Sequence, residues 1–301
     1  MTGATGFIGR ALCAELARAG HALTAVSRDP ARARTTLGDG VECVAWGDDA
    51  WKRALARADR VFHLAGEPPA GRRWTPAFKR KIRASRIDTT RALVQTIRAA
   101  ERRPAVLVSA SGVGYYGDRG DETVTEQTPP GDDFRAEVCV AWEAEAREAE
   151  ALGVRVVCAR IGIVLGDGGP LRQILYPLPV PVSPWKLGLG GPLGGGRQWM
   201  PWVHLDDVTA LLRWAAENPV VRGALNVVAP QPVTNAAFTR ALGRVLRRPA
   251  VFPIPAFAVR LLAGEVAGAL LTGQRALPAL AQDLGYRFEH PEIEVALRSL
   301  L

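Results

Sequence analysis

Short apolar runs rich in β-branched residues alternate with longer helical stretches through the first half of this 301-residue chain, and this alternation constrains the fold most strongly. The expected strands are residues 22–26, 41–46, 60–64, 105–109 and 154–161. The clearest helical patterns are residues 10–19, 75–100 and 134–152. Strand, helix and strand in repetition build a parallel sheet covered by helices on both faces. The sequence therefore predicts an α/β protein with a doubly wound parallel sheet.

The residue composition changes after Gly166, because Gly and Pro are frequent from there to Gly196. Such a stretch predicts a long, irregular and functional loop region. The most prominent members are the run 188–196 and the prolines Pro177, Pro179, Pro181 and Pro184.

A second set of regular elements follows this loop region. We expect a strand at 202–203, a helix at 206–216, a strand at 224–228 and a helical part from Asn235 onward. The resulting prediction is an NADP-binding Rossmann domain over 1–165, to which 202–229 return, and a smaller substrate-binding region over 166–301.

Composition excludes several functional classes. The formal charge is +8, but nearly all basic residues are scattered arginines with no nucleic-acid reader motif, so we expect no nucleic-acid partner. The four cysteines form no CxxC pair, which predicts neither a metal site nor a disulfide framework and fits a reducing, cytoplasmic location. No apolar run predicts a membrane span or an export signal, and the oligomeric state is left open.

Three glycines near the N-terminus, Gly3, Gly6 and Gly9, have GxxGxxG spacing and run directly into a helical pattern. In a dinucleotide site such glycines make a tight turn, let the backbone approach a pyrophosphate and allow close packing of helix on sheet. The alternative is an ordinary glycine turn, because the motif by itself is a weak signal.

The strand at 22–26 ends in Ser27 and Arg28, where such folds present a side chain to the adenosine ribose. An acidic residue there would favour NAD, whereas a guanidinium and a hydroxyl suit the 2′-phosphate of NADP. The sequence thus predicts NADP(H) as cofactor. An exposed arginine at a strand end is the alternative.

Only Met1 and Thr2 precede Gly3, although a turn of this kind normally follows the first and central strand of the sheet. Without that strand, the two neighbouring strands would leave backbone groups unpaired, at about 1–3 kcal/mol each. We therefore expect a short apolar segment upstream in the natural protein. Alternatively, residues from elsewhere fill the position.

Several longer motifs resemble a known family across essentially the whole chain. They are TGATGFIG (2–9), VFHLAGEPP (61–69), SRIDTTRAL (85–93), SASGVGYYGD (109–118), Trp142-Glu143, RIGIVLGDGG (160–169), GLGGPLGGGRQWMPWVHLDD (188–207), LNVVAPQPVTN (225–235) and GQR (273–275). The chain resembles atypical extended short-chain dehydrogenases/reductases of the epimerase family, which are NAD-dependent epimerase/dehydratase-like, NADP-dependent oxidoreductases with a family-specific C-terminal region.

The resemblance implies a set of cofactor contacts. These are Gly3, Thr5, Gly6, Phe7 and Ile8 in the turn, Ser27 and Arg28 at the 2′-phosphate, Leu64, Ala65 and Gly66 on the adenine side, and Lys81, Arg86 and Ile163. For Lys81, a solvated charge on a helix is the equal alternative.

The usual catalytic pair of the superfamily, Tyr-x-x-x-Lys, is missing from this chain. In that pair the lysine and the cofactor ribose lower the tyrosine pKa. The candidates for moving a proton are instead Ser111, Tyr115 and Tyr116, which follow the strand at 105–109 at the edge where such sheets bind ligands. The tyrosines could equally serve packing. Glu143 is a further titratable candidate, although an ordinary helix-surface position is the favoured interpretation.

Substrate contacts are expected from the glycine-rich loop and the segment after it. Arg197, Gln198 and Trp199 offer donors and an aromatic face that suit an anionic or sugar-like substrate. His204 could contact substrate, but a structural hydrogen bond is favoured because no base or metal partner is visible.

Two hypotheses for the function follow. The first is an NADP(H)-dependent oxidoreductase or sugar-nucleotide epimerase-like enzyme acting on a small polar substrate. The second, motivated by the missing Tyr-Lys pair, is a non-catalytic NADP(H)-binding sensor or regulatory protein.

Overall fold

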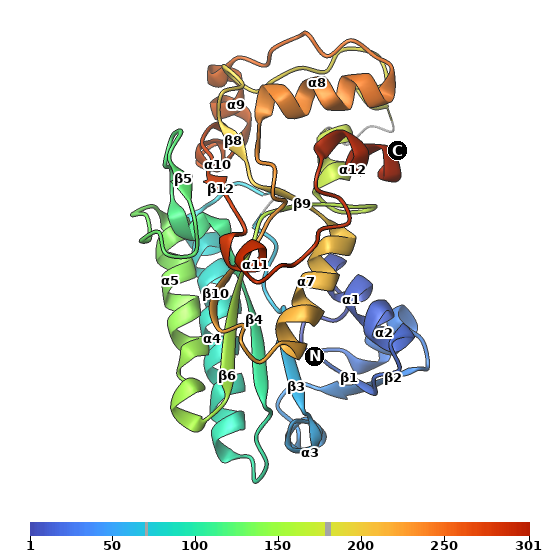
Figure 1. The fold of residues 1–301 in the computed structure, drawn as a ribbon, viewed down its shortest axis with the longest axis vertical. Helices are drawn as coiled ribbons and strands as arrows, with labels where there is room; N and C mark the ends of the chain where they lie inside the picture. Colours follow the sequence, from blue (N-terminus) through green and yellow to red (C-terminus); the bar gives the residue numbers. More distant parts are fainter. Residues whose placement is uncertain (70–71, 178–181) are drawn as a thin grey trace.

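The computed structural model describes residues 1–69, 72–177 and 182–301 and contains a parallel sheet covered by helices (Figure 1). Four strands pair in the order β10 (Gly223–Val227), β6 (Arg155–Ile161), β4 (Val106–Gly112) and β3 (Arg60–His63). Two more, β1 (Leu23–Ser27) and β2 (Val41–Ala45), pair with each other. Every pairing among these six strands is parallel, so the predicted α/β class and parallel sheet are confirmed.

The first two residues join the two groups of strands. The Thr2 N–H donates to the Phe62 carbonyl at 3.0 Å, and the Val26 N–H donates to the Met1 carbonyl at 2.7 Å. Thr2 thereby bridges β1 on one side and β3 on the other. The turn TGATGFIG consequently begins at the centre of the sheet, between β1 and β3, whose carboxyl ends lie at the same edge.

Helices cover both faces of the sheet because side chains along each strand alternate between the faces. Phe62 and Val108 pack with α1 (Phe7–Arg18) and α7 (Leu205–Glu217). Their chain neighbours Val61 and Leu107 pack with residues of α3 (Asp49–Arg57), α4 (Pro76–Ala99) and α5 (Phe134–Arg147). The doubly wound arrangement predicted from the sequence is therefore present.

Two differences from the expected helices have local causes. The helix expected at 134–152 ends at Arg147, and a 3-10 turn, η2 (Glu150–Leu152), leads through the left-handed Gly153 into β6. Helices α2 (Pro30–Leu37) and α3 are short, with 8 and 9 residues, so each offers few turns in which a helical period can be recognised. Each begins instead at an aspartate cap: Asp29 accepts from the Arg32 N–H, and Asp48 from the Trp51 N–H.

The second half of the chain contributes to the sheet and also builds a separate cluster of helices. Strand β9 (Trp202–His204) pairs with β7 (Ile163–Leu165), and the chain then forms α7 and the edge strand β10. The other elements are α6 (Pro170–Leu175), β8 (Trp199–Met200), β11 (Val233–Thr234), α8 (Asn235–Leu246), α9 (Ala256–Ala263), α10 (Val266–Leu271), β12 (Arg275–Ala276), α11 (Ala279–Asp283) and α12 (Ile293–Leu300). Strand β12 pairs with β5 (Thr123–Val124), and β11 with β8.

The expected irregular region is largely irregular: in its described residues, α6 and β8 are the regular elements between 166 and 201. Pro179 and Pro181 lie outside the described residues. In the described chain, no helix combines the length and the apolar character that crossing a membrane requires.

Candidate functional site

The glycine turn has the geometry that only glycines allow. Gly3 has φ +69°, and a Cβ there would lie 2.5 Å from the Leu64 carbonyl carbon. A Cβ on Gly9 would lie 2.1 Å from the Gly3 carbonyl oxygen. Helix α1 starts at Phe7 with Gly6 as its N-cap and no capping side chain, so its first N–H groups are available to an anion.

Some of the residues expected beside the turn approach Gly3 directly, and others contact Gly66 and Glu67, which follow Leu64 and Ala65 in the chain. Leu64 and Ala65 approach Gly3, and the Arg86 guanidinium lies 3.4 Å from the position of a Cβ on Gly66. Arg86 donates to the Glu67 carbonyl at 3.0 Å. The Lys81 side chain, 54% exposed, forms a 3.0 Å ion pair with the Glu67 carboxylate.

Phe7 connects the turn to the start of the glycine-rich region. Cβ atoms on Gly166 and Gly169 would lie 2.9 and 2.3 Å from the Phe7 ring, so both glycines pack directly on it. Ile163 opens β7, where its N–H donates to the Pro201 carbonyl at 2.7 Å. Within the turn, Thr5 is exposed and Ile8 is half-buried.

Ser27 and Arg28 end β1, the strand that Thr2 joins to the centre of the sheet. The Ser27 hydroxyl is engaged with the backbone of Asp29, and the Asp29 carboxylate caps α2 by accepting from the Arg32 N–H at 3.0 Å. Arg28 is exposed. The nearest carboxylate is therefore committed to a helix cap, while the guanidinium stays accessible.

A buried ion pair stands at the carboxyl end of β6. The Arg160 guanidinium donates two bonds to the Glu143 carboxylate, at 2.8 and 2.9 Å, and the Ser111 hydroxyl donates a third at 2.7 Å. Arg160 is 2% exposed and Glu143 4%. Burial alone would lower the pKa of Arg160, but the bonds to Glu143 outweigh it and raise that pKa, so Arg160 stays charged.

The expectation that Glu143 occupies an ordinary helix-surface position is wrong. Helix α5 turns this side chain inward, where Arg160 from β6 supplies the compensating charge. No sequence pattern indicates this pairing, because the two residues are 17 positions apart on different elements.

Cys139, which sequence reasoning left without a role, lies on α5 four residues before Glu143, the spacing of the missing Tyr-Lys pair. Its sulfur is 3.8 Å from the position of a Cβ on Gly112. Burial raises the pKa of this thiol to about 11, and a bond with the Ser111 side chain opposes the shift. A neutral thiol and a carboxylate, four residues apart on α5, therefore face Ser111.

The two candidate tyrosines have different surroundings. Tyr116 is fully buried; its hydroxyl donates to Asn226 Oδ1 at 2.6 Å and accepts from Arg160 at 3.0 Å. Burial raises the pKa of Tyr116 to about 12. Tyr115 is only half-buried, and the Arg160 guanidinium lies over its ring, 3.4 Å from the centroid. Ser111, Tyr115 and Tyr116 are thus gathered around Arg160, and Tyr115 is the most accessible of them.

The substrate candidates near the glycine-rich loop are mostly engaged in holding that loop. Gln198 donates to the carbonyls of Leu193 and Leu270, at 3.1 Å each. Trp199 donates to Asp121 at 2.8 Å and carries the Arg275 guanidinium over its ring. Arg197 is exposed.

His204 is buried at the N-cap of α7, where Nδ1 accepts from the Asp206 N–H at 3.2 Å. Its ring stacks on His290 with centroids 3.8 Å apart, and burial, together with His290, lowers the pKa of His204 to about 4. His204, His290 and Asp206 together offer metal-ligand atoms that the sequence did not indicate. His204 Nδ1 is, however, already used as the helix cap.

Comparisons with known proteins identify relatives for the whole chain. The model of the NAD dependent epimerase/dehydratase family matches residues 1–228, and a domain of unknown function, DUF1731, matches residues 254–300. The chain is 39% identical over 305 residues to the chloroplastic epimerase family protein SDR39U1 homolog of Arabidopsis thaliana, covering 100% of this chain and 86% of that protein. It is 38% identical over 304 residues to epimerase family protein YfhF of Bacillus subtilis, with 100% and 97% covered.

A solved structure extends the comparison to three dimensions. The crystal structure of human epimerase family protein SDR39U1 (isoform 2) with NADPH superposes with a TM-score of 0.86. The two chains are 36% identical, and the match covers 99% of this chain and 97% of the human one.

Proposed function

The chain belongs to the NAD dependent epimerase/dehydratase family, and from this premise we propose that it binds NADP(H) at the glycine turn and acts on a small polar substrate. The reaction is of the oxidoreductase or sugar-nucleotide epimerase-like kind. The observation that carries the proposal is the turn at Gly3–Gly9, whose helix N–H groups lack side-chain caps and whose neighbouring strand ends in an accessible arginine. The human relative's structure with NADPH supports the same cofactor.

The proposed cofactor contacts keep the grouping expected from the sequence. Gly3, Thr5, Gly6, Phe7 and Ile8 face the pyrophosphate, Ser27 and Arg28 the 2′-phosphate, Leu64, Ala65 and Gly66 the adenine side, and Lys81, Arg86 and Ile163 the remaining contacts. Residues 1–165 with 202–229 form the cofactor domain in this proposal, and the rest of 166–301 binds substrate.

Tyr115 is the proton donor in this proposal. When bound, NADPH supplies a hydride to a carbonyl carbon, and the Tyr115 hydroxyl donates a proton to the carbonyl oxygen. Arg160, fixed by Glu143, positions the Tyr115 ring by lying over its face. Tyr116 is bonded at both its donor and acceptor positions, which makes it a positioning residue. Ser111 holds Glu143 in place and stays a candidate contact for the substrate oxygen.

Substrate recognition is assigned to the side of the site formed by the glycine-rich loop. Arg197 is the exposed basic group there, and it suits an anionic or sugar-like substrate. Gln198, Trp199 and His204 act mainly by holding the loop and the start of α7, because each already has protein partners.

The experiment is a turnover screen of carbonyl compounds and nucleotide sugars with NADPH, followed by the loss of NADPH absorbance. We expect turnover of at least one polar carbonyl substrate, and Tyr115→Phe should remove it while leaving NADPH affinity unchanged. Its pH profile should not report a tyrosine activated by lysine. Full turnover by the Tyr115→Phe variant would instead move the proton donor to Ser111.

A specific observation favours the second candidate function, a non-catalytic NADP(H) sensor. The positions that normally hold the activated tyrosine and its lysine lie in a buried, ionised and hydrogen-bonded cluster around Glu143. NADPH binding without turnover across a broad substrate panel would support that function over catalysis.

A further inference from the structure

Exposed apolar side chains are concentrated on one region of the molecule. Ten of the fifteen large apolar side chains that are exposed in the described chain fall within 182–189 and 251–270. The two stretches run side by side: the Phe252 N–H donates to the Gly190 carbonyl at 3.2 Å, and the Ile254 N–H to the Pro192 carbonyl at 2.9 Å. The two stretches that carry these exposed side chains are therefore adjacent.

Helix α9 turns its apolar face away from the protein. Phe257 and Leu261, four residues apart on one side of the helix, are each 72% exposed. Val259, on the opposite side, is buried. An apolar face directed toward water is unfavourable unless another surface covers it.

The chain segments that contain this region are rich in basic side chains and poor in acidic ones. Residues 168–205 and 218–264 contain no acidic side chain. They contain nine basic ones: Arg172, Lys186, Arg197, Arg222, Arg240, Arg244, Arg247, Arg248 and Arg260. We call segments 186–189 and 240–262 the basic apolar face.

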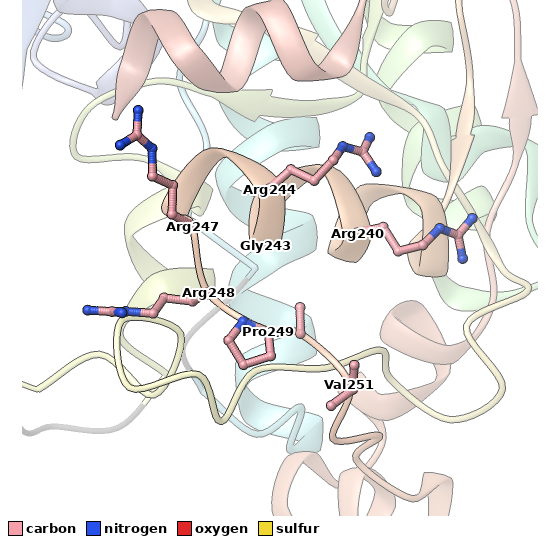
Figure 2. A pocket seen from close by; sticks show the side chains of 8 residues that line it. Arg240, Gly243, Arg244, Arg247, Arg248, Pro249 and Val251 are labelled. Atoms are coloured by element: carbon pink, nitrogen blue, oxygen red, sulfur yellow. The ribbon is translucent and has the colours of Figure 1, made fainter.

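The arginines of α8 and the loop after it are spread along this face. Arg240, Arg244, Arg247 and Arg248 line a shallow cavity of about 520 Å³ together with Pro249 and Val251 (Figure 2). Arg247 and Arg248 point to one side and Arg240 to the other (Figure 2). Arg244 is already paired with Glu294 at 2.7 Å, whereas Arg240, Arg247 and Arg248 diverge. These three guanidinium groups do not enclose one small anion, but each can meet a separate phosphate on an extended anionic surface.

We propose that the basic apolar face docks on an anionic lipid bilayer, with Phe257 and Leu261 inserted among the acyl chains and the arginines at the headgroup phosphates. Apolar burial combined with attraction to anionic lipids is how proteins bind at a membrane surface without crossing the bilayer. A second copy of this chain is a poorer match, because its identical face would bring arginine against arginine. A nucleic acid would satisfy the charge but would leave the aliphatic side chains in water. The proposal departs from the sequence-based expectation, which predicts no membrane partner.

The test is flotation of the intact protein with phosphatidylcholine vesicles that contain or lack phosphatidylglycerol. We expect binding that requires phosphatidylglycerol. Arg240→Glu/Arg247→Glu should lower it roughly 25-fold or more, since each basic group near an anionic surface contributes about a fivefold factor. Phe257→Ser/Leu261→Ser should lower it roughly tenfold or more. An unchanged melting temperature shows that these surface variants are folded.

Matched controls lie away from the basic apolar face. Arg18→Glu/Arg53→Glu, on α1 and α3, makes the same charge change, and Val140→Ser/Val220→Ser removes exposed apolar side chains elsewhere. Both should bind vesicles like the unmutated protein. Three results would overturn the proposal: vesicle binding that ignores phosphatidylglycerol, a dimer in light scattering that Phe257→Ser/Leu261→Ser dissociates, or binding to duplex DNA with no binding to vesicles.

Discussion

Replacing Glu143 with Gln should strongly destabilise the protein, because it leaves the Arg160 charge buried without its counter-ion. In the native structure Arg160 makes two bonds to Glu143, and both side chains are almost completely buried. Removing one partner of such a pair lowers the free energy of unfolding by about 3–5 kcal/mol. A typical neutral hydrogen bond contributes only about 1 kcal/mol. The loss is a large share of a total stability of roughly 5–15 kcal/mol.

Helix α5 offers a matched control two residues further along. Glu145 also pairs with an arginine, Arg91, but the Arg91 side chain is 51% exposed, so water can solvate that charge when its partner is removed. Glu145→Gln should therefore change the free energy of unfolding little. Glu143→Gln/Arg160→Met should recover part of the loss, because it removes the uncompensated charge as well.

Urea unfolding followed by circular dichroism measures all four proteins. The unmutated protein and Glu145→Gln should have the highest urea midpoints, the double variant an intermediate one and Glu143→Gln the lowest. The slopes should be similar. A free energy of unfolding for Glu143→Gln within about 1 kcal/mol of that of the unmutated protein would refute the reasoning, because the buried pair would then contribute no more than an exposed one.

Three further predictions concern the cofactor turn and the buried histidine. Arg28→Ala should lower NADPH affinity roughly ten- to a hundredfold in calorimetry and leave NADH affinity nearly unchanged; equal affinities of the unmutated protein for both cofactors would contradict this. Gly9→Ala should abolish NADPH binding because its Cβ would lie 2.1 Å from the Gly3 oxygen, whereas Gly40→Ala, with no atom within 4 Å, should bind normally. Burial lowers the pKa of His63 from 6.5 to about 4, so the folded state takes up its proton later than the unfolded state as pH falls. Stability should therefore be fully present above pH 6.5 and decline between 6.5 and about 4, by about 1.4 kcal/mol per pH unit for this group. His63→Gln should remove that part of the slope in urea midpoints measured across the window.

The parts of the fold that the sequence predicts are those set by local physics. The strands at 41–46 and 154–161 are visible because β-branched and apolar residues suit a strand buried on both faces. The glycine turn is visible from its spacing, and part of its cause is local: a Cβ at Gly9 would collide with the Gly3 carbonyl, whereas one at Gly3 would collide with Leu64, which follows β3. Helix α3 is harder to predict because it has only 9 residues, so its apolar positions Trp51 and Leu55 repeat once before the helix ends.

The candidate site is less predictable because its chemistry is set by partners distant in sequence. Glu143 looks like a surface residue in an Ala- and Glu-rich helix, and only the sheet brings Arg160 and Ser111 to it. With Arg160 and Ser111 beside it, the Glu143 carboxylate can be buried on the inward side of α5. One face of the Arg160 guanidinium then lies over the Tyr115 ring. A lysine at position 143 would place two cations together in this buried cluster, so it would be incompatible with the buried Arg160. Any proton chemistry at this site has to be compatible with the fixed Glu143–Arg160 pair, which leaves the more accessible Tyr115 phenol beside it as the group to test first.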